Sequence, residues 1–120
     1  MKKVRFEAEL MEGHKGVTFV LVPFDPEKKW SQKPVRLAGR RHGWLIVGTA
    51  NAASFEGYIG ERWNRYFIMI EPALRDAAKV KLGDVLAMCV EPTTSPRAFA
   101  QAYEQSKVTT QPKKARTDAT

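Results

Sequence analysis

Short segments in which apolar and polar residues alternate make up most of the chain. In residues 4–11, VRFEAELM, the side chains of Val4, Phe6 and Ala8 alternate with charged ones, as a strand with one buried face requires. Further strands are expected at 17–22, 35–39, 44–50, 54–60, 65–71 and 84–91. Turns that contain glycine or asparagine separate most of them at short, regular intervals, and this spacing predicts a β-barrel or a β-sandwich.

Proline residues mark the places where helices interrupt this pattern. Asp25 precedes Pro26, and this pair suits the start of a short helix because aspartate caps the first turn and proline fits its first position. Pro72 opens the alanine-rich segment 72–80, which predicts a second helix of about two turns.

A third helix is expected near the end of the chain, with Ser95 as its cap. Phe99, Ala102 and Tyr103 follow at spacings of three and four residues and would form one apolar face. Either the parent barrel or a second copy of the chain must cover that face. We expect docking on the parent barrel, with the protein existing as a monomer or as a homodimer.

The length of 120 residues is enough for one domain with one core. We expect a β-barrel domain over 1–92, the C-terminal helix over 93–108 and a flexible basic tail over 109–120. With 43% hydrophobic and 28% charged residues, the composition is typical of a globular protein.

Charge and cysteine content indicate the compartment. The N-terminus, MKKVRFE, is charged where a signal peptide needs an apolar run, and no segment is long and apolar enough to span a membrane. A single cysteine cannot form an internal disulfide. We therefore expect a cytoplasmic protein that does not contact membranes. Its net charge of +7 favours polyanionic partners or simply keeps the protein soluble.

No motif in the sequence predicts catalysis. Cys89 lies between Met88 and Val90, so we expect a packed thiol rather than a nucleophile. Gly83 and Asp84 separate a helix from a strand and suit a helix end and a turn. His14 and His42 sit beside glycines without metal-ligand spacing. We expect no catalytic residues, no metal and no cofactor.

Two clusters pair arginine with tryptophan. The binding candidates are Arg40, Arg41 and Trp44 in the first cluster, and Arg62, Trp63 and Arg65 in the second. Guanidinium groups bind phosphates and aromatic rings stack on bases. The simpler interpretation is that Trp44 packs inside while the arginines face water. Lys113, Lys114 and Arg116 would add a loose electrostatic contact to any polyanion.

The segments VRFEAEL, TFVLVPF, VRLAGRRHGWLIVGTAN and RYFIMIEPALRDAAKVKLGDVLAMCVEP, in this order, resemble an uncharacterised bacterial family, a domain of unknown function. The resemblance covers residues 4–92, and its most specific element is Leu82, Gly83, Asp84 and Val85. It implies a mainly β fold, a small double-split β-barrel of the AbrB and MazE class, with about seven strands and short capping helices. Larger relatives can carry a second domain associated with bacteriocin resistance, which we do not expect here. The family brings no established catalytic residues.

Two hypotheses about function follow. The first is a small non-catalytic binding module that contacts nucleic acid or another macromolecule through its basic and aromatic surface, by analogy of fold with the AbrB class. The second is a pocket binder or weak enzyme that holds a small molecule in the barrel mouth.

Overall fold

The computed structural model describes residues 2–110. Within them lie the strands β1 (Val4–Glu9), β2 (Met11–Glu12), β3 (Thr18–Val22), β4 (Val35–Arg36), β5 (His42–Ala50), β6 (Ala53–Arg62), β7 (Arg65–Met69) and β8 (Val85–Pro92). The α-helices are α1 (Pro26–Trp30), α2 (Pro72–Ala78) and α3 (Pro96–Thr110), and a 3-10 turn, η1, spans His14–Gly16. Residues 111–120, with Lys113, Lys114 and Arg116, lie outside the described part.

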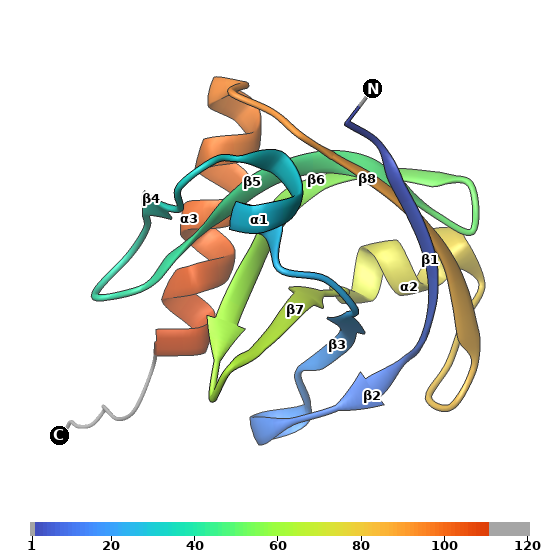
Figure 1. The fold of residues 1–120 in the computed structure, drawn as a ribbon. Coiled ribbons are helices and arrows are strands. Elements are labelled where there is room, and N and C mark those ends of the chain that lie inside the picture. The colour runs from blue at the N-terminus through green and yellow to red at the C-terminus, as the bar shows by residue number, and fades with distance from the viewer. Residues whose placement is uncertain (1, 111–120) are drawn as a thin grey trace, which may run out of the picture.

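The strands form a nearly closed antiparallel barrel (Figure 1). Seven of them follow the order β1-β8-β5-β6-β7-β3-β2, and β4 pairs with the start of β5. β2 continues β1 just after Leu10, so one bent segment pairs with β8 at one end and with β3 at the other. This bend brings the two ends of the sheet together. The predicted mainly β barrel with short helices and a C-terminal helix is confirmed.

Inward-facing side chains fill the barrel. Ile46, Ile59, Ile68 and Val90 come from four strands and are almost completely buried. Burying each such side chain stabilises the fold by about 1.5–3 kcal/mol. Packed aliphatic side chains therefore occupy the interior of the barrel.

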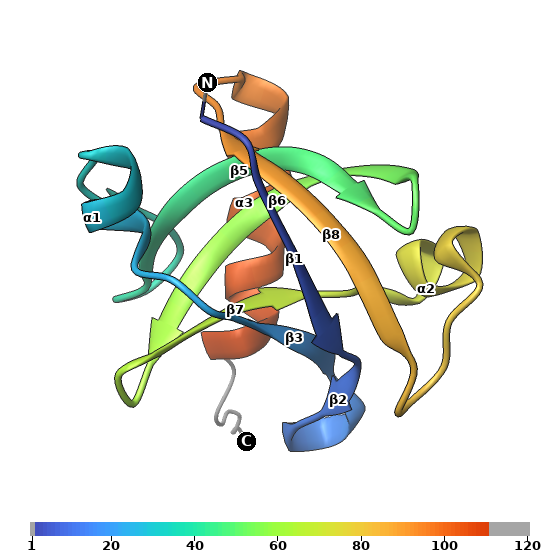
Figure 2. The ribbon, with the colours of Figure 1, turned by 45° about the vertical axis from the view of Figure 1, so that its right-hand side comes forward.

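The helix α3 lies against the outer face of β5 and β6 (Figure 2). Beneath it, Leu45, Tyr58 and Met69 form a second apolar cluster together with Ala102. The middle of β5 is therefore covered on both faces, which explains why residues 44–47 read as a continuous apolar run rather than an alternating one.

The face that α3 buries agrees with the expected one at Ala102 but not at Phe99 and Tyr103. Phe99 and Tyr103 remain 41% and 40% exposed, whereas Ala102 and Ser106 are fully buried. Small side chains let the helix approach the sheet closely, and the Ser106 hydroxyl accepts a hydrogen bond from the Ala38 amide at 3.1 Å. The apolar spacing predicted the helix, but close approach selected the neighbouring stripe of small residues.

Both helix caps proposed from the sequence are present. The Asp25 carboxylate accepts a hydrogen bond from the Glu27 amide at 2.9 Å at the start of α1. The Ser95 hydroxyl accepts one from the Arg97 amide at 3.2 Å at the start of α3. Each cap satisfies a backbone donor that would otherwise have no partner within the helix.

The Gly83–Asp84 turn has a structural role, with one difference from expectation. The helix α2 ends one turn earlier, at Lys79 with a φ of 59°, and Gly83 adopts a φ of 90° in the turn that follows. The Asp84 carboxylate accepts a hydrogen bond from the Lys81 amide at 3.0 Å. Glycine is therefore needed to redirect the chain into β8, not to end the helix.

The β5–β6 hairpin turns through Asn51 and Ala52, with φ values of 49° and 71°. The left-handed conformation costs about 1–2 kcal/mol for a residue with a side chain, and such a two-residue turn favours glycine in its second position. We expect Ala52→Gly to raise the free energy of unfolding by about 0.5–1 kcal/mol, measured by urea denaturation. An Ala52→Gly protein that is less stable than the parent would contradict this turn geometry.

Candidate functional site

Three basic segments meet at one end of the barrel. Gly43 pairs with Gly60, which brings the 37–41 turn beside the β6–β7 hairpin. The C-terminal half of α3 joins them through the hydrogen bond between Ala38 and Ser106. Together these segments carry Arg36, Arg40, Arg41, Arg62, Arg65 and Lys107, which we call the basic end. Glu61 and Glu104 lie on the same segments, and Glu104 is paired with Lys107 at 3.7 Å.

Trp63 is the most exposed large apolar side chain at this end. It is 84% exposed at the tip of the β6–β7 hairpin. Arg62 pairs with Arg65 across the hairpin, and the Arg62 guanidinium lies 5.0 Å from the centre of the Trp63 ring. Trp63 and Asn64 have φ values of 54° and 63°, a turn that favours Asn-Gly and disfavours tryptophan. The chain therefore holds a large aromatic ring in water at an energetic cost.

A shallow hollow of about 490 Å³ lies beside this hairpin. Its lining includes Phe24, Asp25, Asn64, Arg65 and Tyr66. Burial raises the pKa of the Tyr66 hydroxyl, and the Asp25 carboxylate raises it further. Tyr66 hydrogen-bonds to the Asp25 side chain, so its one O–H donor already has a partner.

The first candidate cluster does not form a surface site around its tryptophan. Trp44 is 4% exposed and its indole nitrogen donates a hydrogen bond to the Gln32 carbonyl at 2.7 Å. The ring is therefore part of the core and cannot stack on an external base. Arg40 is exposed and Arg41 half-buried in the neighbouring turn. The two arginines therefore lie in a turn at the barrel end that also carries the Trp63 hairpin, whereas the Trp44 ring is buried.

The described strands and turns match one known family. Residues 6–90 fit the family described as Domain of unknown function (DUF1905). The chain belongs to the DUF1905 family. No curated protein matches it. The match includes the Trp63 hairpin and the 37–41 turn, whereas α3, from Pro96, follows the matched part of the DUF1905 domain.

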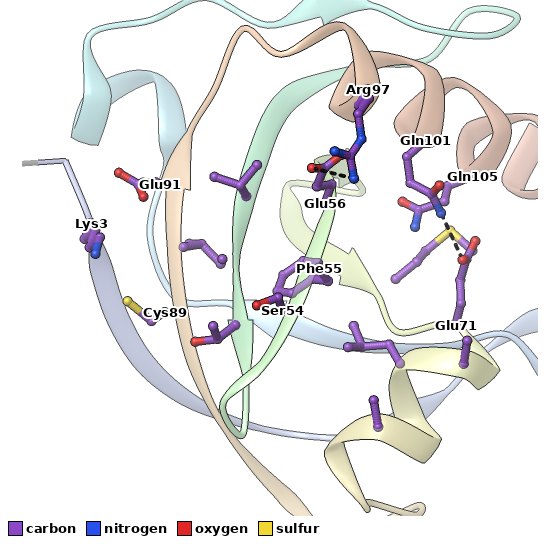
Figure 3. Close-up of a pocket in the computed structure, with 18 of the residues that line it drawn as sticks. Lys3, Ser54, Phe55, Glu56, Glu71, Cys89, Glu91, Arg97, Gln101 and Gln105 are labelled. Atoms are coloured by element: carbon purple, nitrogen blue, oxygen red, sulfur yellow. Dashed lines mark hydrogen bonds and ion pairs between the residues drawn. The ribbon is translucent and has the colours of Figure 1, made fainter.

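A second candidate site lies on the outer face of the DUF1905 domain. An open groove of about 780 Å³ crosses β1, β8, β5 and β6 and ends between α2 and α3 (Figure 3). Glu56 is paired with Arg97 at 3.6 Å, and the Gln101 amide donates to the Glu71 carboxylate at 3.2 Å. Sequence patterns did not predict this groove, because its polar residues come from a strand, a loop and a helix that are far apart in sequence.

Cys89 lies in this groove and not in the core. It is half-buried on the outward face of β8, directly across from Arg5 of β1. The neighbours Met88 and Val90 point inward and are buried. We expected a packed thiol because the sequence of β8 is apolar on both faces. Only alternate residues of this DUF1905 strand reach the core, and Cys89 is not one of them.

Within residues 2–110, no three His, Cys, Asp or Glu side chains are grouped closely enough to hold a metal ion. His14 and His42 are exposed, in a turn and at the start of β5. None of the described helices of this DUF1905 chain has the length and apolar character needed to cross a bilayer.

Proposed function

We propose that this protein is a non-catalytic module that binds single-stranded nucleic acid through its basic end. The observation that carries the proposal is Trp63, an exposed ring held in an unfavourable backbone conformation between two arginines. Strained, exposed residues of this kind are maintained where they contact a partner.

The ring and its flanking cations supply the two contacts that single strands need. An unpaired base presents a flat face, and stacking on an aromatic side chain contributes about 1–3 kcal/mol. Arg62 and Arg65 lie within one hairpin of the ring, where they would meet the phosphates on either side of the stacked base. A duplex keeps its bases stacked internally, so Trp63 selects the single-stranded form.

The remaining cations would extend the path of the strand. Arg40 and Arg41 lie in the neighbouring turn, and Lys107 lies at the C-terminal part of α3. Lys113, Lys114 and Arg116 follow α3 in the sequence and would contribute non-specific attraction. This charge distribution favours binding that depends on salt and little on sequence.

Fluorescence anisotropy with a labelled, mixed-sequence oligonucleotide of single-stranded DNA tests the proposal. We expect binding at 20 mM NaCl that weakens steadily with salt, with a slope of log K against log salt of about −2 to −4, since each phosphate contact contributes about −0.7. A matched duplex should bind more weakly at every salt concentration. Absence of binding at 20 mM NaCl, or tighter binding of the duplex, would overturn it.

From the family resemblance we also propose that the barrel has the double-split form of AbrB and MazE proteins and that the protein is bacterial. A cytoplasmic location fits a nucleic-acid partner. A monomer would suffice for this binding mode, because the basic end is formed by a single chain.

A further inference from the structure

The groove between α2 and α3 contains a polar group with an unmet hydrogen-bonding requirement. The Gln105 side chain lines the groove, and Gln105 is only 5% exposed. Among the described residues, its amide has no hydrogen-bond partner, although Gln101, one turn earlier, donates to Glu71. An amide buried without partners costs about 1–3 kcal/mol, and native proteins rarely retain such a group without a use for it.

The backbone beneath Gln105 is shaped to receive its amide. A side chain at Gly57 of β6 would begin 3.1 Å from the Gln105 oxygen. Glycine at this position therefore leaves room for the amide between β6 and α3. Figure 3 shows Gln101 and Gln105 side by side on α3, with Glu71 next to Gln101 and Glu56 on β6 next to Arg97.

Hydrogen-bond acceptors dominate this end of the groove. Glu56 and Glu71 contribute two carboxylates. Arg97, the cation that faces them, is 87% exposed at the rim and lies 3.6 Å from Glu56, so it is a weak, displaceable partner. The opposite end, along β1, carries Lys3 and Arg5 beside Glu91, which leaves the negative charge concentrated between the helices.

Apolar surface lies next to these acceptors. Phe55, Met69 and Leu74 line the same end of the groove. A group that combines positive charge and several donors with an aliphatic stem would fit both features. Its head would bond to the carboxylates and to the Gln105 oxygen, and its stem would cover the apolar side chains.

We propose that the α2–α3 end of the groove binds an ammonium or guanidinium group carried on an aliphatic stem. Such a group occurs in small amines and in lysine or arginine side chains, including Lys113, Lys114 and Arg116 of this chain. The site is distinct from the basic end and has the opposite charge preference. It therefore stands whether or not the protein binds nucleic acid.

Titration of the full-length protein with agmatine, followed by NMR of the glutamine side-chain amides, tests this site. We expect the Gln105 and Gln101 amide resonances to shift with saturation in the millimolar range, while glutarate, an anion of similar length, produces no shift. Gln105→Met, which keeps the volume but removes the amide, should weaken agmatine binding at least 5-fold. Trp63→Ala should leave agmatine binding unchanged and thereby separates this site from the nucleic-acid surface.

A full-length variant in which Lys113, Lys114 and Arg116 are replaced by serine distinguishes the two sources of the basic group. If the chain supplies its own side chain, this variant should show altered Gln105 resonances without ligand and should bind agmatine more tightly. If the group comes from another molecule, both proteins should bind agmatine equally. The inference is overturned if agmatine shifts neither glutamine amide in either protein, or if Gln105→Met binds it as tightly as the parent.

Discussion

Replacing Trp63 with alanine should weaken the binding of single-stranded DNA by about 10-fold or more at fixed salt, because base stacking on one aromatic ring contributes about 1–3 kcal/mol. Trp63 makes few contacts with the rest of the protein, since 84% of its surface is exposed. The free energy of unfolding should therefore change by less than about 0.5 kcal/mol. Anisotropy titrations and urea denaturation measure the two effects separately.

A double variant, Trp63→Asn with Asn64→Gly, gives a sharper test of the same residue. It installs Asn-Gly in a turn whose φ values, 54° and 63°, favour that pair. We expect it to be more stable than the parent by about 1 kcal/mol, because the ring no longer has to occupy the left-handed region, yet to bind DNA as weakly as the alanine variant. Unchanged DNA affinity in this more stable protein would rule out a role for the ring.

Replacing Gly48 with alanine should cause the largest loss of stability in the barrel. A methyl group at this position would overlap the carbonyl oxygen of Cys89 and lie 2.9 Å from the Val90 Cα. Both atoms are backbone atoms of β8, so relief requires β5 and β8 to separate along the register that pairs Gly48 with Val90. We expect a loss of about 3 kcal/mol or more, measured by urea denaturation with circular dichroism as the signal.

Gly57→Ala is the matched control, since it changes the same residue type within the neighbouring strand. Its methyl group would meet the amide end of Gln105 at 3.1 Å, a flexible side chain that can move. The cost should stay within about 1 kcal/mol. If both variants lose the same stability, close approach of β5 and β8 is not what requires glycine at position 48.

Local patterns predicted most strands and helices of this fold, although the strand expected at 35–39 ends at Arg36 and the first strand is divided into β1 and β2. The alternation in β1, the prolines that open α1 and α2 and the Asp25 and Ser95 caps all act within a few residues. What sequence spacing did not provide was the contact surface of α3. That surface is decided by how closely the helix approaches β5 and β6, a tertiary property that favours Ala102 and Ser106 over the larger Phe99 and Tyr103.

In the candidate site, too, contacts between sequence neighbours were predicted and contacts made by tertiary packing were not. Arg62, Trp63 and Arg65 are adjacent in sequence and remain together in the structure, because a two-residue turn joins them. Trp44 also has arginine neighbours in sequence, but its position on the inward face of β5 places it in the core. The groove was not predicted, because Gln105 and Glu71 come together only when α3 docks on the barrel.

Chemical-shift mapping with a single-stranded oligonucleotide shows which surface of the protein contacts the strand. The isotope-labelled protein, free of DNA at the start, is titrated with the oligonucleotide at low salt. We expect the largest amide shifts at residues 38–42 and 61–66, with the indole resonance of Trp63 among the most perturbed. The buried indole groups of Trp30 and Trp44 should shift little. Shifts confined to the groove between α2 and α3, or no shifts at all, would show that the basic end does not bind single-stranded DNA.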